Sequence, residues 1–147
     1  MTDKEQTLVV LHEEDTEFEA TGLRKQFVYR DLGIGKATGG QYNAHVIRAG
    51  SDPSRIEEHM HTGLHFQLVY VIRGNVTFWY EGRGTETLKA GSVHLLPPGI
   101  KHSVESWSDD LEMVEITSPE DYGTELVAEA AEEGVNAAEQ PDLNSCW

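Results

Sequence analysis

Short runs of β-forming residues, separated by turn residues, make up most of the chain. The clearest run is HFQLVYVIRG (65–74), which is rich in β-branched and aromatic residues and ends at Gly74. Such runs recur at regular spacing, which is typical of an all-β sandwich or barrel. Further strands are expected at 42–49, 75–82, 86–91, 92–99, 102–107 and 111–117, with LVVL (8–11) as an edge strand and 34–41 and 50–58 as loops.

A helix is expected only near the C-terminus. Pro119, followed by Glu120 and Asp121, is a helix-start signal, because proline suits the first helical position and acids suit the first turn. This predicts a short C-terminal helix over 119–134, stopping at Gly134, and a flexible tail over 135–147. The length suits one domain, and no repeat or interior boundary is visible. We therefore expect a single domain spanning 1–147.

Composition narrows the possible partners and the compartment. Eleven Lys and Arg face 26 Asp and Glu, a formal net charge of −15. Such a chain repels phosphate backbones and anionic lipid, so neither nucleic acid nor a membrane is an expected partner. Cys146 is the single cysteine, which excludes an intramolecular disulfide and favours a reducing compartment. With no secretory signal and no membrane-spanning run, the expected location is cytoplasmic.

Histidines cluster where the chemistry is expected. His59, His61 and His65 fall within seven residues, and His102 follows the turn Pro97-Pro98-Gly99. Alternate residues of a strand share a face, so an unbroken strand would place His59, His61, His65 and Gln67 on one side. Imidazoles two residues apart can bind one metal ion together, and imidazole suits Zn, Cu, Fe and Ni. The pattern therefore predicts a metal site.

Two segments resemble the conserved motifs of the cupin superfamily. EEHMHTGLHFQLVYVIRG contains the His-x-His of the first motif, His59 and His61, and its closing Gly74. GSVHLLPPGIKHSVES matches the second motif, with Gly91, Pro97, Gly99 and His102 at the expected spacings. The resemblance covers about 40–118.

The resemblance implies a fold, a cofactor and partners. The fold is a double-stranded β-helix, or jelly-roll barrel. The cofactor is one divalent metal ion (Fe, Ni, Mn or Zn) bound by His59, His61, His102 and a fourth ligand. A small-molecule substrate or ligand and a homodimer are also expected.

The fourth ligand is where this chain departs from the cupin pattern. Where the motif has a Glu separated from the closing glycine by six residues, this chain has Gln67, whose neutral amide oxygen leaves more positive charge on the metal. Five residues separate His61 from Gln67, one more than the pattern allows. Counting back from Gly74 selects Gln67, whereas counting forward from His61 selects His65. We prefer Gln67 and keep His65 as the alternative.

The reaction is less constrained than the metal. The chain resembles a group of small proteobacterial cupins, and a Gln in place of Glu is similar to cupins that act on sugar acids and to some dioxygenases. We expect a metal-dependent enzyme acting on a small acidic or carbohydrate-derived substrate, by isomerase, lyase or dioxygenase chemistry. The alternatives are a non-catalytic sensor or binding protein and, last, a structural role. Glu115, near the end of a late strand, is the candidate general base, against the ordinary interpretation of an outward, solvated carboxylate.

Overall fold

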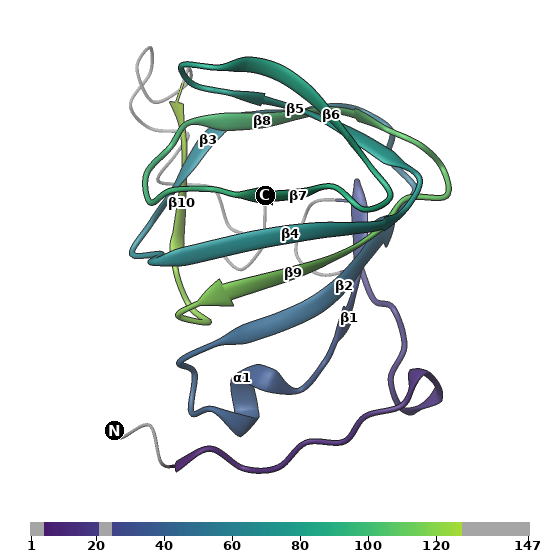
Figure 1. The fold of residues 1–147 in the computed structure, drawn as a ribbon, viewed down its shortest axis with the longest axis vertical. Helices are drawn as coiled ribbons and strands as arrows, with labels where there is room; N and C mark the ends of the chain where they lie inside the picture. Colours follow the sequence, from purple (N-terminus) through teal and green to yellow (C-terminus); the bar gives the residue numbers. More distant parts are fainter. Residues whose placement is uncertain (1–4, 21–24, 128–147) are drawn as a thin grey trace.

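Two five-stranded antiparallel sheets stack on each other in the computed structural model, which describes residues 5–20 and 25–127 (Figure 1). The first sheet has the order β1-β2-β9-β4-β7 and the second β10-β3-β8-β5-β6. No helix in these ranges has the length and apolar character that crossing a membrane requires. The elements are η2 (Glu13–Asp15), β1 (Phe27–Asp31), α1 (Ile34–Ala37), β2 (Asn43–Ala49), β3 (Ile56–Thr62), β4 (Phe66–Arg73), β5 (Asn75–Tyr80), β6 (Gly84–Lys89), β7 (Val93–Leu95), β8 (His102–Trp107), β9 (Glu112–Ser118) and β10 (Gly123–Leu126).

The expected all-β jelly roll is confirmed, and its strands alternate as a half-buried sheet requires. Along β9 the buried residues are Met113, Glu115 and Thr117, while the residues between them are partly exposed. The same alternation along the other strands turns one face of each sheet toward the space between the sheets. The apolar part of this interior includes Phe27, Ile47, Ile56, Val69, Val71, Val76, Phe78, Val104 and Met113.

The inward face of each central strand changes from apolar to polar along its length. In β9, Met113 is followed by Glu115 and Thr117, and in β4, Val71 and Val69 stand at one end and Gln67 at the other. Because Gln67 pairs with Thr117, these polar residues gather at the same end of the sheet. One end of the barrel is therefore a packed core, and the other is a polar interior.

Three local predictions differ from the structure. Residues 8–11 form no strand, and the side chains of Leu8 and Val10 are 90% and 69% exposed, because this segment joins neither sheet. The expected loop 50–58 contains the start of β3 at Ile56, and the expected loop 34–41 contains α1. In each case the run of apolar residues is too short to show whether the segment pairs in a sheet, forms a helical turn or stays a loop.

The predicted helix 119–134 is wrong over the residues that the structure describes up to Leu126. Instead of a helix, β10 (Gly123–Leu126) pairs antiparallel with β3 and extends the second sheet. A backbone edge of β3 is available for pairing, and the sheet hydrogen bonds outweigh the local helix-start signal. Residues 128–134 of that predicted helix and the tail 135–147 lie outside the described residues.

Replacing Gly74, which closes the first cupin-like segment, is expected to lower the stability of the fold. It has φ +77°, and an added Cβ would meet Ser108 Oγ, Asp110 Oδ1 at 2.7 Å and the Leu111 Cα at 2.9 Å. Left-handed strain and overpacking together should make Gly74→Ala lower the free energy of unfolding by about 2–4 kcal/mol. Urea unfolding measures this value.

Gly63 supplies the matched control. It has the same φ of +77°, but no atom lies within 4 Å of the position that an added Cβ would take. Gly63→Ala should therefore cost only the backbone strain, about 1–2 kcal/mol. Equal losses in the two variants would contradict the packing argument.

Candidate metal centre

Three histidines converge on the buried face of the second sheet. His59 and His61 stand two residues apart on β3, and His102, the first residue of β8, is the cross-strand partner of His59. Their ring centroids are 4.3–5.1 Å apart, and the three side chains are at most 4% exposed. One ligating nitrogen from each ring lies within 4.8 Å of the others. The sequence-predicted trio is thus brought together as one buried group.

A hydrogen bond at Nδ1 orients each of these rings. The Nδ1 of His59 lies 2.8 Å from the Glu57 carbonyl oxygen, and that of His102 lies 3.1 Å from the Ile100 carbonyl oxygen. The Nδ1 of His61 lies 2.9 Å from the hydroxyl of Thr124 on β10. A carbonyl only accepts, so the proton of a neutral ring sits on Nδ1 in His59 and His102. Their buried Nε2 atoms then carry a lone pair suited to a metal ion.

A second polar group lies on the inward face of the first sheet. Gln67 on β4 and Glu115 on β9 are each 1% exposed, and the Gln67 Nε2 donates to Glu115 Oε2 at 2.7 Å. Glu115 also lies on a row of cross-strand partners, here called a rung. In this rung it pairs with His45 on β2 and with Val69 on β4, and Val69 pairs in turn with His94 on β7. In the second sheet, His102 pairs with His59 on β3 and with Tyr80 on β5, which forms a second rung. The Tyr80 hydroxyl lies 2.8 Å from His94 Nδ1, so the two rungs meet at their β5 and β7 ends.

His65 lies apart from this group. The strand that carries His59 and His61 stops at Thr62, and Gly63, with φ +77°, turns the chain before β4 begins at Phe66. The alternation of faces therefore restarts, and His65 is exposed while Gln67 is buried. Of the two candidates for fourth ligand, Gln67 is the one that the fold places in the interior. Its role as a ligand stays a prediction.

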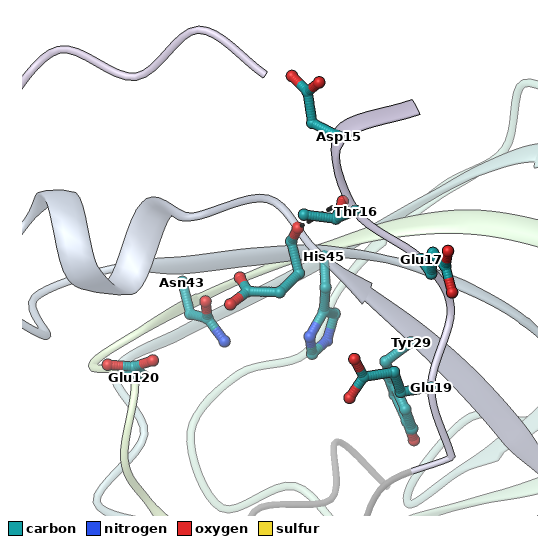
Figure 2. Close-up of a pocket in the computed structure, with 9 residues that line it drawn as sticks. Asp15, Thr16, Glu17, Glu19, Tyr29, Asn43, His45 and Glu120 are labelled. Atoms are coloured by element: carbon teal, nitrogen blue, oxygen red, sulfur yellow. Dashed lines mark hydrogen bonds between the residues drawn. The ribbon is translucent and has the colours of Figure 1, made fainter. Parts of the chain in front are cut away.

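A cleft of about 750 Å³ opens beside the first sheet and reaches the polar interior at His45 (Figure 2). The Nε2 of His45 lies 2.6 Å from Glu115 Oε1, and the His45 side chain is 14% exposed. Figure 2 shows the His45 imidazole between Asn43 on one side and Glu19 and Tyr29 on the other. Carboxylates dominate the lining, which consists of Asp15, Thr16, Glu17, Glu19, Tyr29, Asp31, Asn43, His45 and Glu120.

The charges in this cleft affect one another. Burial, and then the charges of Asp121 and Asp31, raise the pKa of Glu120 above its usual range.

A second cavity of about 430 Å³ lies between β5, β6 and β7 and is lined by Leu88, Leu96, Ile100, Tyr80 and His94 among others. The polar interior is thus flanked by an acidic cleft near β2 and by a more apolar cavity near β7.

Two contributors to the site are not singled out by the sequence. Thr124, which holds His61, lies in the segment predicted as helix, and only its pairing with His61 across β10 and β3 reveals its role. His45 is one of several polar or aromatic residues on barrel strands, with nothing in the sequence to distinguish it. Its contact with Glu115 joins residues 70 positions apart, so no local spacing signals it.

The stacked jelly-roll sheets with three converging histidines define a cupin. Within this superfamily, residues 43–117 match the family model of the AraC-like ligand binding domain, and the chain belongs to that family. The match spans the strands from β2 to β9 and includes His59, His61, Gln67, His102 and Glu115.

Solved cupin structures share the fold at low sequence identity. An RmlC-like cupin from Shewanella frigidimarina is 21% identical, with a TM-score of 0.59 over 78% of this chain and 94% of that one. A predicted oxalate decarboxylase from Thermotoga maritima is 20% identical, with a TM-score of 0.62 over 76% and 99%. The polyketide cyclase RemF from Streptomyces resistomycificus is 16% identical, with a TM-score of 0.63 over 93% and 99%. Among curated protein sequences, none matches the chain.

Proposed function

We propose that this cupin is a metal-dependent enzyme whose divalent ion is held by His59, His61 and His102, with Gln67 as fourth ligand. The observation that carries the proposal is the buried histidine trio, whose Nδ1 atoms are occupied by hydrogen bonds and whose Nε2 atoms are buried together. Imidazole and amide ligands suit Fe, Ni, Mn or Zn. When bound, such an ion would act as a Lewis acid on a substrate oxygen.

Glu115 and His45 are the groups that we propose to hold the proton that the reaction moves. Glu115 is too deeply buried to reach a molecule in the cleft directly, and its Oε1 lies 2.6 Å from the His45 Nε2. His45 stands between Glu115 and the cleft. A carboxylate that orients an imidazole is a common general-base arrangement. The general-base role expected of Glu115 is therefore proposed as a shared role of this pair.

The charge of the cleft sharpens the proposed substrate class. Isomerase, lyase and dioxygenase chemistry all remain compatible with three histidines and a neutral ligand. A small acidic or carbohydrate-derived substrate is the expectation from the sequence, but five carboxylates line the cleft beside His45. They oppose the entry of an anion by this route. We therefore favour an uncharged, carbohydrate-derived compound, whose hydroxyl groups can donate to these carboxylates.

Removing the metal tests the proposal. Protein purified without added metal should contain about one divalent ion per chain. Incubated with a panel of neutral sugars, sugar acids, diols and enols, with products detected by mass spectrometry, it should convert at least one compound. Dialysis against a chelator should abolish this conversion, and adding back the metal originally found should restore it, because the proposed chemistry depends on the ion.

A non-catalytic sensor is the second candidate, and the family supports it, since its model describes a ligand binding domain. A sensor would bind a compound from the same panel, seen as a rise in melting temperature, and release it unchanged. Binding without conversion in the metal-loaded protein would thus favour the sensor over the enzyme. The homodimer and the cytoplasmic location stay predictions. Exposed apolar side chains on the outer faces of β4 and β7, such as Tyr70 and Leu95, are consistent with a dimer contact.

A further inference from the structure

Glu115 is a buried carboxylate in an unusual setting. Its side chain is fully buried, yet none of the ion pairs in the described residues joins it to a lysine or arginine. Its carboxylate contacts the Gln67 amide at 2.7 Å and the His45 ring at 2.6 Å. Burying a charge is costly unless a cation or several hydrogen bonds compensate for it. A nearby divalent ion would supply that compensation.

The register of the first sheet fixes these contacts. His45 on β2 is directly opposite Glu115 on β9, and Gln67 on β4 pairs with Thr117, two residues further along β9. Three adjacent strands therefore present His45, Glu115 and Gln67 on the same inward face. Each oxygen of the Glu115 carboxylate has one of the two neighbours.

The contact determines which end of the Gln67 amide faces away from Glu115. An ionised carboxylate only accepts hydrogen bonds, so it selects the NH₂ end of the amide. The carbonyl Oε1, which is the atom able to bind a metal, then lies on the other branch of the amide. Without the carboxylate, the two ends of the amide would be nearly equivalent.

We infer that Glu115 is a positioning residue for the metal centre: it orients the Gln67 amide with its oxygen available to the metal and places a negative charge one hydrogen bond behind that ligand. This inference rests on the proposed metal centre. It also revises the expectation drawn from the sequence that a Gln leaves the metal with an uncompensated charge. The carboxylate that other cupins use as a ligand has a counterpart here, displaced to the next strand.

Cobalt binding tests this inference, with Co²⁺ as the probe. Glu115→Gln removes the charge and leaves the orientation of Gln67 undetermined, so the dissociation constant for Co²⁺ should rise about 10–100-fold. The Co²⁺ absorption bands should shift as well, because the fourth ligand changes. Glu112→Gln is the matched control: it makes the same change on the same strand, at a carboxylate that pairs with Arg48 and Arg73 instead. It should leave both the constant and the spectrum unchanged.

An exchange of the two side chains gives the decisive arm. Gln67→Glu combined with Glu115→Gln restores one carboxylate and one amide, so it should bring Co²⁺ affinity back to within about threefold of the original. A merely structural role for Glu115 predicts no such rescue. If the unchanged protein binds Co²⁺ and Glu115→Gln binds it equally well, the inference is overturned while the metal centre stands. If the unchanged protein binds no Co²⁺, the proposed function itself fails.

Discussion

Changing both His59 and His61 to alanine is expected to reduce bound metal from about one ion per chain to a trace. The two side chains supply two of the three imidazoles that converge between β3 and β8. Losing a group that only orients a ligand already costs roughly 10–100-fold in metal affinity, so losing two ligands should cost well over a hundredfold. Elemental analysis of the purified proteins, with a chelator titration of affinity, measures the change.

The double variant must be compared with one that removes two histidines elsewhere. His12→Ala/His65→Ala serves, because both of these side chains are exposed. Its metal content should match that of the unchanged protein. Loss of metal in this control would identify His65 as a ligand and would remove Gln67 from the assignment. Circular dichroism of both metal-free variants checks that each retains the β fold.

The three histidines could be predicted from the sequence because their arrangement is largely local. His59 and His61 share a face by the two-residue period of a strand, and the turn that precedes β8 sets the position of His102 at its start. The cross-strand pair of His59 with His102 then follows from the jelly-roll order. Periodicity and motif spacing are sufficient for this part of the site.

Gln67 and His65 show where that local rule stops. An alternation continued from His61 would put both residues on one face, but the turn at Gly63 interrupts the strand and resets the faces. Counting back from Gly74 chooses the buried residue because β4 runs without a break from Phe66 to Arg73. Alternation is informative only within one continuous strand.

The contacts behind the ligands could not be predicted, because they depend on register between distant segments. Glu115 meets His45 and Gln67 only because β9 lies between β2 and β4 with particular residues opposite each other. The contact of Thr124 with His61 could not be predicted, because the helix-start signal before it suggests a helix, whereas the segment pairs with β3. Local propensity carries no information about which edge of a sheet is vacant.

Acid should destabilise this protein partly through His94. Burial, with a further contribution from the charge of His102, lowers the pKa of His94 from 6.5 to about 3. Burial and the charge of Glu86 raise the pKa of Tyr80, so its hydroxyl stays protonated, and it hydrogen-bonds with His94 Nδ1 at 2.8 Å. The folded protein therefore keeps His94 neutral over a range in which the unfolded chain protonates it.

The sign of the effect follows from proton binding. Between pH 6.5 and about 3 the unfolded state binds the proton at His94 and the folded state does not, so stability falls as the pH falls. The loss approaches about 1.4 kcal/mol per pH unit within that window. Above pH 6.5 neither state is protonated at His94, and this residue contributes no pH dependence.

His94→Gln is the variant that isolates this effect, since the amide can still hydrogen-bond with the Tyr80 hydroxyl but does not titrate. In the metal-free proteins the free energy of unfolding, from urea titrations at pH 7, 6, 5 and 4, should fall further for the unchanged chain. By pH 4 the two declines should differ by about 2–3 kcal/mol. All other residues are the same in the two proteins, so the difference between the declines reports His94 together with its charge coupling to His102. Parallel declines would mean that His94 takes up its proton equally in the folded and unfolded states, and that the interior around β7 admits a charge.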